Sequence, residues 1–445
     1  MIPPRARPEA VVSPFFSNNH PGMRVGPDQA FHLSYCTNIH PGESWPEVAE
    51  QLERHVPAVR EQVGEGGSFG IGLRLANQAA EELLEGDALD RFADWLADRD
   101  CYVYTINGFP YGRFHGERVK DEVYRPDWRE PERVAYTIRL ARILAELLPE
   151  GVDGSISTSP LSYKRWLGEE EYDRVKDRAS RNLSEVVGEL ARIEEETGRE
   201  IHLAIEPEPD CLIENTEETV GFFEDHLLPI GAARLSERRH ASRVEAERLI
   251  RRHVGICYDT CHIAVEYEEP EDLLAAAAEA GVRISKVQLS SALRIASVRP
   301  EIADRLRPFA EDIYLHQVLA VRDGEENGPL RRYPDLGPAL DALEAGVHED
   351  AASASEAEAE VVPGEEWRIH YHVPIFVNRY EDGGIELGST QSSVERALDV
   401  LLEDPEICSH LEIETYTWGV LPERLKEDVD TSIAREYEWV LDRLG

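Results

Sequence analysis

The residues best suited to chemistry in this sequence are acids and histidines at the ends of apolar, strand-like segments. In IHLAIEPEPD, alternation places His202, Glu206 and Glu208 on one face. Pro207 and Pro209 end the strand, because proline cannot donate a hydrogen bond to a sheet. Glu206 would then stand above an apolar core, where a carboxylate needs a cation or a hydrogen-bond partner. The competing interpretation is a structural glutamate bonded to nearby backbone or to an arginine.

Two further segments carry candidate ligands. In VGICYDTCHIAVEYE, Asp259 ends a strand and His262 follows three residues later, so both can lie on one side of a strand-to-loop bend. Asp259 could instead cap a helix, for which aspartate is a preferred residue. In KVQLSSA, Gln288 shares a face with Lys286, and a buried amide there is a weak metal ligand, a substrate contact or a hydrogen-bonded core residue.

Histidines and cysteines raise the question of a transition metal. In RIHYHVPIF, His370 and His372 lie at strand spacing on one face, where two imidazoles can chelate a metal or pack as hydrogen-bonded core residues. Cys257 and Cys261 are the only close pair among six cysteines. No second pair completes a tetrahedral set, so we expect core thiols there.

The last strand-like segment, HLEIETYTW, places two acids on one face. Glu412 and Glu414 are hard to accommodate in an inert core, although a structural salt bridge would explain them. Glu414 lies nearer the carboxyl end and is the better ligand, whereas Glu412 would lie one layer deeper. Tyr416 and Trp418 continue the same face and become candidate substrate contacts.

Eight β-rich runs alternate with helical stretches, which predicts parallel strands joined by right-handed crossovers. The predicted strands are 30–39, 68–76, 101–109, 154–160, 201–208, 254–260, 284–291 and 410–418, and the predicted helices include 46–63, 78–96, 131–148, 169–197, 271–280 and 392–403. No GxGxxG motif follows the first strand, so the pattern favours an α/β fold of the (β/α)8 TIM-barrel type over a dinucleotide-binding sheet. A ninth run, 367–376, either extends a loop or adds a strand.

In such a barrel, function lies at the carboxyl ends of the strands. The early strands end in amides and a few other polar residues, and Asn38 and Asn107 are the candidate substrate contacts among them. The predicted domain spans 30–445. Residues 1–29 are Pro-rich and predict a disordered extension, and 344–366 predict a flexible acidic surface insertion.

Charge and composition exclude several functions. The chain has 88 acidic against 47 basic residues, a net charge of −41, which argues against nucleic acid as a partner. The positive charge is nearly all arginine, and we interpret the excess acid as adaptation to a halophilic, high-salt cytoplasm. No apolar run is long enough to span a bilayer, and the first residues lack a signal-peptide pattern, so we expect a cytoplasmic protein without membrane insertion.

The order of these candidates resembles the metal site of xylose-isomerase-like barrels, the sugar phosphate isomerase/epimerase superfamily. IEPEPDCLIENTEE and YDTCHIAVEYEEP are similar to the segments that carry the first two ligands. The resemblance implies one divalent ion (Mn, Mg, Co, Fe or Zn) held by the residues that match the family's ligand positions, Glu206, Asp259, Gln288 and Glu414, with His262 beside Asp259. It also implies that Glu206 and Glu414 act as an acid/base pair next to a carbonyl.

Other features of the resemblance concern the substrate. The pair His370 and His372 is additional to the isomerase pattern and is similar to the extra ligands of multi-zinc members, which implies a possible second ion. Within the superfamily, LSYCTNIHPGESW, INGFPYGRFHGERVKDEVYRPDW, GSISTSPLSYK, KVQLSSAL, IHYHVPIF and LEIETYTWGVLP are similar to a group of metabolite traffic proteins linked to export. Two functions therefore stand: an isomerase or epimerase for a small carbonyl or polyol compound, or a binding protein in an export pathway. The predicted substrate contacts are Asn38, Asn107, Glu208, His262, Lys286, Tyr416 and Trp418.

Overall fold

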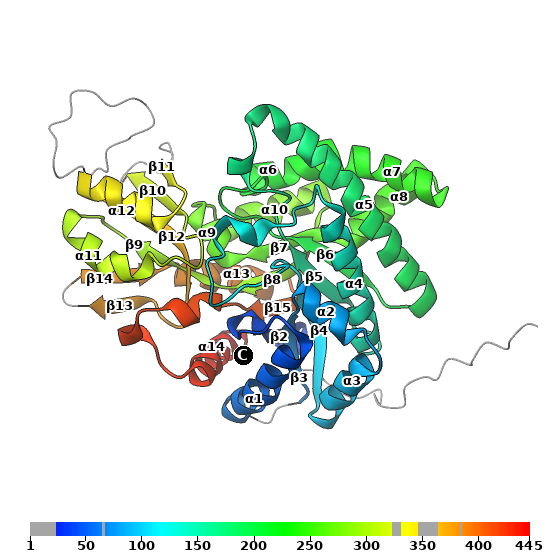
Figure 1. The fold of residues 1–445 in the computed structure, drawn as a ribbon, viewed down its shortest axis with the longest axis horizontal. Helices are drawn as coiled ribbons and strands as arrows, with labels where there is room; N and C mark the ends of the chain where they lie inside the picture. The colour runs from blue at the N-terminus through cyan, green and yellow to red at the C-terminus, as the bar shows by residue number, and fades with distance from the viewer. Residues whose placement is uncertain (1–23, 65–66, 323–330, 346–363, 383–384) are drawn as a thin grey trace, which may run out of the picture.

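A computed structural model describes residues 24–64, 67–322, 331–345, 364–382 and 385–445. Eight parallel strands close into a barrel in the order β2-β15-β8-β7-β6-β5-β4-β3, and β3 pairs back onto β2. This confirms the predicted (β/α)8 barrel, shown in Figure 1. The barrel strands are β2 (Phe31–Cys36), β3 (Phe69–Arg74), β4 (Cys101–Asn107), β5 (Gly154–Thr158), β6 (Ile201–Ile205), β7 (Val254–Asp259), β8 (Arg283–Leu289) and β15 (His410–Ile413).

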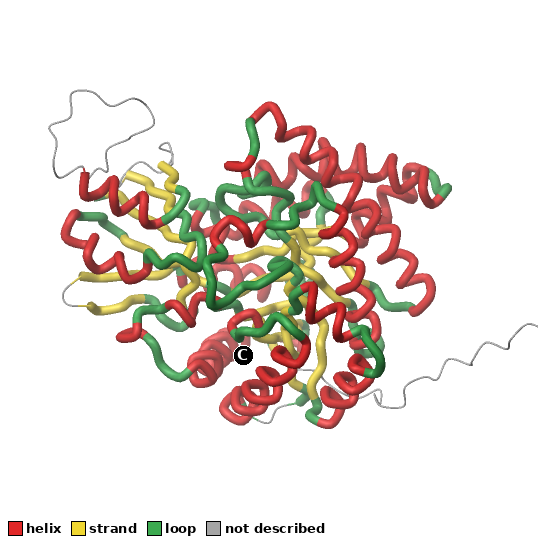
Figure 2. Tube along the Cα trace, viewed as in Figure 1, coloured by secondary structure: helices red, strands yellow, loops and turns green. Residues whose placement is uncertain are grey.

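Helices follow the strands and cover the outside of the barrel, as the tube view shows (Figure 2). The longest, α5 (Tyr172–Thr197), buries a stripe of apolar residues and ends at Gly198, which adopts the left-handed conformation. The other α-helices around the barrel are α1 (Trp45–Val63), α2 (Asn77–Leu83), α3 (Ala88–Asp98), α4 (Pro131–Leu147), α6 (Thr216–Gly221), α7 (Ala232–Arg239), α8 (Arg243–His253), α9 (Thr260–Val265), α10 (Pro270–Ala280), α13 (Gln391–Glu403) and α14 (Val429–Leu444). A π-helical segment, η6 (Phe222–Gly231), joins α6 to α7.

One helix prediction needs correction. The run expected as a single helix over 78–96 forms α2 and α3, because Gly86, with φ 60°, interrupts it in a turn. Short 3-10 turns occupy several loops: η1 (Pro27–Gln29), η2 (Thr37–Ile39), η3 (Lys120–Tyr124), η4 (Lys164–Trp166), η5 (Glu169–Glu171), η7 (Pro300–Ile302), η8 (Arg307–Phe309), η9 (Tyr416–Val420) and η10 (Glu423–Leu425).

A second, antiparallel sheet is inserted between the last two barrel strands. Its strand order is β11-β10-β12-β9-β14-β13, and it stands beside the barrel in Figure 1. Its elements are β9 (Ser291–Ile295), α11 (Ala303–Leu306), β10 (Val318–Arg322), β11 (Arg331–Tyr333), α12 (Leu336–Ala345), β12 (Glu365–Val373), β13 (Arg379–Asp382) and β14 (Ile385–Ser389). A separate apolar cluster that includes Phe309, Leu340 and Trp367 supports it. The predicted span 30–445 therefore contains the barrel and this added sheet.

The inserted sheet decides the role of the ninth β-rich run. Of the two interpretations offered for 367–376, the added strand holds, because β12 pairs with both β9 and β10. Residues 346–363 of the predicted acidic loop and residues 1–23 of the predicted extension lie outside the described residues. Within that extension, β1 (Arg24–Val25) pairs antiparallel with β2. No described helix is both long and apolar enough to cross a bilayer.

Candidate metal centre at the barrel rim

Three buried carboxylates meet where barrel strands end. Glu206 directly follows β6, Asp259 ends β7, and Glu414 directly follows β15. One carboxylate oxygen from each lies within 4.8 Å of the others. We refer to these three residues as the rim carboxylates. They come together because parallel strands point their carboxyl ends to the same side of a barrel.

Asp259 is both a helix cap and an open ligand. Its Oδ1 accepts hydrogen bonds from the backbone N–H of Cys261 at 2.7 Å, the N–H of His262 at 3.1 Å and Ser290 Oγ at 2.6 Å. These bonds cap α9, so the structural interpretation of Asp259 is correct. Its Oδ2 has no hydrogen-bond partner among the described residues, which leaves that oxygen available for a cation.

Glu414 is oriented by amides from early strands. Asn38 Nδ2 and Asn107 Nδ2 both donate to Glu414 Oε1, at 2.7 Å and 2.9 Å. Glu206 is held less firmly, since its Oε2 is buried with no hydrogen-bond partner in the described part of the chain. The sequence predicted Asn38 and Asn107 as substrate contacts, and in the structure both amides also orient Glu414, a candidate metal ligand.

Electrostatics make this acid cluster costly without a cation. Burial and the charges of Glu414, Asp259 and Glu208 raise the pKa of Glu206 well above its ordinary value. Burial and the charge of Asp259 do the same to the pKa of Glu414. Burial alone would also raise the pKa of Asp259, but the nearby imidazoles of His262 and His372 hold it below its ordinary value. Buried acids this close together match the donor set of a divalent cation.

Two imidazoles face each other through their Nε2 atoms beside the rim carboxylates. His262 Nδ1 lies 3.0 Å from the carbonyl of Pro207, and His370 Nδ1 lies 2.8 Å from Gln317 Oε1. Gln317 is fixed in this orientation because its Nε2 donates to the carbonyl of Pro209 at 3.1 Å. If both Nδ1 atoms carry the protons, the two Nε2 atoms face each other 3.0 Å apart without a proton between them. A cation or an added proton would relieve this contact.

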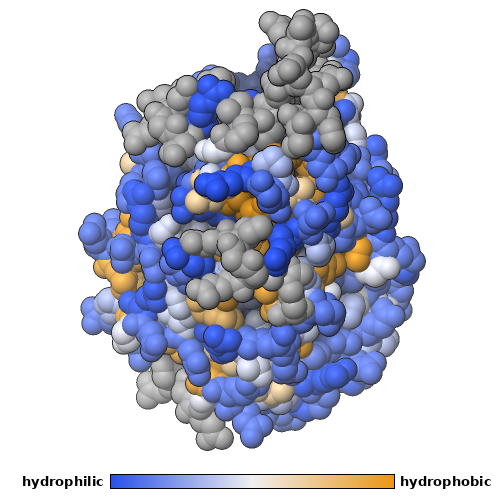
Figure 3. Space-filling model, turned by 90° about the vertical axis from the view of Figure 1, so that its left-hand side faces the viewer, coloured by the Kyte–Doolittle hydropathy of each residue, from blue (hydrophilic) through white to orange (hydrophobic). Residues whose placement is uncertain are grey.

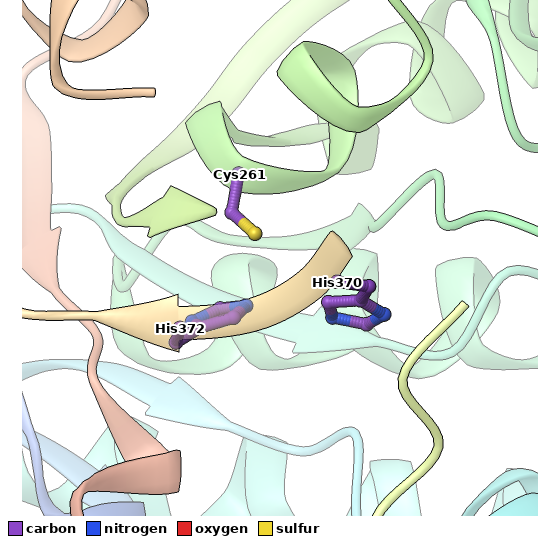
Figure 4. A group of neighbouring side chains, drawn as sticks. All are labelled: Cys261, His370 and His372. Carbon is purple, nitrogen blue, oxygen red and sulfur yellow. The ribbon is translucent and has the colours of Figure 1, made fainter. Parts of the chain in front are cut away.

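A third imidazole and a thiol complete the surroundings. His372 Nδ1 lies 3.0 Å from the Glu414 carbonyl, and its buried Nε2 has no partner among the described residues. Possible ligand groups are Asp259 with His262 and His372, and Glu208 with His262 and His370. Cys261, on α9, directs its sulfur toward β12, which carries both His370 and His372 (Figure 4). Burial raises the pKa of Cys261 well above its ordinary value, so in this arrangement it is a neutral thiol.

Three other predicted residues lie near the rim carboxylates. Gln288 is in register with Asp259 and Glu412 on the neighbouring strands, and its Oε1 accepts from Cys257 Sγ at 3.0 Å. Lys286 and Glu412 form a fully buried ion pair of 2.6 Å inside the barrel. Glu412 is thus the deeper acid that the sequence predicted, and its partner is Lys286.

A narrow cavity opens above the rim carboxylates. Burial raises the pKa of Glu208, on its wall, to about 8, although Tyr124 donates to Glu208 Oε1 at 2.8 Å. The polar lining of the cavity includes the predicted residues Asn38, Asn107, Glu206, Glu208, His262, His370, Glu414 and Tyr416. Lys286 and Trp418 are not part of the described lining. The structure adds lining residues that the sequence did not single out: Phe114, Val119, Lys120, Val123, Tyr124, Tyr314 and Leu315.

Trp418 departs from the expected strand for a local reason. β15 ends at Ile413, and Thr415 has a ψ of 57°, so the chain leaves the extended conformation and forms η9. Thr417 on η9 donates its hydroxyl to the carbonyl of His372 in the inserted sheet. This contact turns Tyr416 toward the cavity. Trp418 lies instead against Lys426, whose Nζ is 5.7 Å from the centroid of the Trp418 ring.

Comparison with known proteins gives similarity in fold alone. No family model and no curated protein matches this sequence. A xylose isomerase-like TIM barrel protein from Mycobacterium smegmatis in complex with magnesium is 12% identical over 93% of this chain and 96% of its own, with a TM-score of 0.45. A xylose isomerase domain protein from Alicyclobacillus acidocaldarius is 13% identical over 93% and 99%, with a TM-score of 0.41. The IOLI protein with a bound zinc atom is 15% identical over 57% and 73%, with a TM-score of 0.33.

Proposed function

We propose that this chain is a divalent-metal-dependent isomerase or epimerase that acts on a small carbonyl or polyol compound. The observation that carries the proposal is the convergence of Glu206, Asp259 and Glu414 within 4.8 Å at the mouth of the barrel. These residues come from parts of the chain far apart in sequence, and Glu206 and Glu414 line one cavity together with amides and imidazoles. The cytoplasmic location, inferred from composition, remains a prediction.

The residues present fit a metal ion. Glu206 Oε2, Asp259 Oδ2 and His372 Nε2 are buried without partners in the described residues, and each is an atom that can donate a lone pair. Glu206, Asp259 and Glu414 would hold the ion, joined by Gln288 if its amide oxygen turns from Cys257. Glu208, His262 and His370 would provide ligands for a second ion, and His372 is grouped instead with Asp259 and His262. A bound ion would polarise a carbonyl or hydroxyl oxygen of the substrate.

The two glutamates are suited to move a proton. Burial and neighbouring acids raise the pKa of both carboxyl groups in the metal-free protein, and a carboxyl group that can both carry and release a proton is what general acid/base catalysis requires. In the proposed reaction Glu206 and Glu414 remove and return a proton at the carbon next to the substrate carbonyl. Asn38 and Asn107 hold Glu414 in place for this transfer, and the apolar side chains of the cavity limit access of water.

The first experiment measures metal content and proton exchange in the purified full chain. We expect at least one divalent ion per chain by elemental analysis, and its loss in the Glu206→Gln, Glu414→Gln double variant with an unchanged circular dichroism spectrum. With the metal-loaded protein, deuterium from D2O should enter at least one carbonyl compound of a panel that includes D-fructose, dihydroxyacetone and hydroxypyruvate. Absence of bound metal from every preparation would refute the proposal.

A second candidate function is metabolite binding without turnover. It is favoured by the apolar cover of the cavity, which includes Phe109, Phe114 and Leu315, because a small sugar offers little apolar surface to such a wall. The six segments similar to the metabolite traffic protein EboE support the same idea, and they lead us to propose partners in an export pathway. Metal binding together with no deuterium incorporation into any compound of the panel would favour this function over catalysis.

A further inference from the structure

The opposite end of the barrel carries a second cluster of metal-binding residue types. Asp153 immediately precedes β5, His202 is the second residue of β6, and His410 is the first residue of β15. Each offers one ligand atom, and the three atoms lie within 4.8 Å of one another. We propose that Asp153, His202 and His410, here named the floor cluster, bind a divalent transition-metal ion of the zinc type.

The contacts in the floor cluster converge on the Asp153 carboxylate. His202 Nε2 lies 3.0 Å from Asp153 Oδ2, and His410 Nε2 lies 3.4 Å from Asp153 Oδ1. His410 is oriented from its other side by Ser155 Oγ, 2.9 Å from Nδ1. Bonding through Nδ1 leaves Nε2 of His410 facing Asp153, and apart from that 3.4 Å contact this buried atom has no hydrogen-bond partner among the described residues. A metal-binding imidazole is commonly fixed in this way through its second nitrogen.

The donor set selects the class of ion. Two imidazoles and one carboxylate are typical ligands of zinc and of neighbouring transition metals, whereas calcium and magnesium prefer oxygen donors alone. Three protein ligands leave a fourth position for water. That position is accessible, because Asp153, His202 and His410 line a surface depression together with residues of the segment before β15, such as Cys408 and Ser409.

Arg283 is the nearest competing charge. Its Nη2 lies 3.4 Å from Asp153 Oδ2, which is longer than the contacts that hold its Nη1. Nη1 donates to Glu200 Oε1 and to the carbonyl of Arg252, both at 2.9 Å. Arg283 is therefore fixed mainly by other partners, and an ion at Asp153 does not require it to move far.

The floor cluster is separate from the rim carboxylates. His202 on β6 and Glu206 just after it are four residues apart, as are His410 and Glu414, which corresponds to about 13 Å along an extended chain. The buried ion pair of Lys286 on β8 and Glu412 on β15 lies inside the barrel, between the floor cluster and the rim carboxylates. An ion at the floor would link β5, β6 and β15, so its expected effect is on stability.

The test compares metal content in matched variants of the full chain. The protein is stripped with a chelator, reloaded with Zn2+ alone and separated from free metal, and zinc per chain is then measured. We expect His410→Gln and Asp153→Asn each to lose one equivalent of zinc relative to the parent. His32→Gln is the matched control, because His32 lies on the same floor, bonded to Tyr102 at 2.8 Å, and is outside the floor cluster.

Cobalt substitution gives a second measurement. Co2+ at two nitrogens and one oxygen produces visible ligand-field absorption, which His410→Gln should reduce and the rim variant Glu206→Gln, Glu414→Gln should leave in place. This arrangement separates the failure of the floor proposal from failure of the rim proposal. If His410→Gln does not fold, Asp153→Asn decides, because its side chain is 33% exposed. A folded floor variant with the zinc content and cobalt spectrum of the parent would overturn the proposal and leave a hydrogen-bonded Asp–His–His cluster.

Discussion

At the scale of single residues, the rim combines buried carboxylate atoms that lack hydrogen-bond partners among the described residues with amides that orient one of the carboxylates. Glu414 Oε1 receives two amide hydrogen bonds, one from β4 and one from the segment after β2. Second-layer groups of this kind fix the direction of a ligand's lone pairs. The contribution of Asn38 and Asn107 should therefore appear in metal affinity more than in folding.

The first prediction concerns these two amides. Asn38→Leu and Asn107→Leu should each weaken Mn2+ binding by about 10–100-fold, because Glu414 loses one of the two groups that orient it. Titration calorimetry with Mn2+ on the metal-free protein measures the change. Asn182→Leu is the matched control, since Asn182 is a buried amide whose Nδ2 donates to the carbonyl of Trp128 instead. Parental affinity in folded variants of Asn38 and Asn107 would contradict this role.

The second prediction concerns the ion pair inside the barrel. Lys286→Met leaves Glu412 buried without its partner and should lower the free energy of unfolding by about 3–5 kcal/mol. The double variant Lys286→Met, Glu412→Leu should recover much of this loss, because no charge then remains buried. Urea unfolding of both variants tests the expectation. As a control, Arg113→Ala breaks an exposed pair with Glu117 and should cost less than about 1 kcal/mol.

Candidate ligands could be predicted from the sequence where a strand ended in an acid. Asp259 shows the limit of that reasoning, because the sequence presented a helix cap and a metal ligand as alternatives. In the structure Oδ1 of this carboxylate caps α9, and Oδ2 has no hydrogen-bond partner among the described residues. Gln317 shows what could not be inferred. It orients His370, yet nothing in its local sequence distinguishes it from an ordinary polar residue, and only the pairing of β12 with β10 brings the two together.

At the scale of elements, all eight barrel strands could be predicted because parallel strands buried on both sides are short and apolar. The inserted sheet could be predicted only as one extra run. Its strands differ in burial, from the half-buried β11 to the largely buried β9, and antiparallel pairing between residues far apart, such as β9 with β12, leaves no local periodic signal. The break between α2 and α3 was signalled by Gly86, but a single glycine also occurs within helices.

The third prediction concerns α14, which is hydrogen-bonded through one buried acid to the segments that follow β15 and β12. Glu436 accepts from Thr415 Oγ1 at 2.7 Å and from the Ile375 N–H at 3.1 Å, and burial raises its pKa to about 7. The folded state thus binds this proton more tightly than the unfolded state. Its contribution to stability is complete below pH 4.5 and is lost as pH rises through about 7.

Glu436→Gln should remove this pH dependence. Between pH 5 and pH 8 the parent should lose about 2.5 kcal/mol more free energy of unfolding than the variant, from the shift in this one pKa. Urea unfolding at both pH values and constant salt provides the comparison. Glu438→Gln, an exposed neighbour on α14, serves as the control and should follow the parent. Identical pH dependence in the parent and in Glu436→Gln would show that this carboxyl does not bind its proton more tightly in the folded state.

At the scale of the whole molecule, charge is the dominant feature. The net charge is −41, and four of the five lysines make internal or paired contacts. These four are Lys120, Lys164, Lys286 and Lys426. The face shown in Figure 3 is largely hydrophilic, with apolar residues in small patches between polar ones. Positive charge on the surface is thus supplied mainly by arginine, and it does not balance the acids.

The fourth prediction follows from this imbalance and from the proposed high-salt host. Repulsion among surface acids weakens when the screening length falls from about 10 Å at 0.1 M salt to about 3 Å at 1 M. The melting temperature should therefore rise by several degrees between these KCl concentrations. Sucrose at matched osmolality is the control, because it stabilises compact proteins by exclusion without screening charge. A melting temperature that KCl raises no more than sucrose does would mean that the acidic surface is not an adaptation to salt, since repulsion among its carboxylates would then be too weak to affect folding.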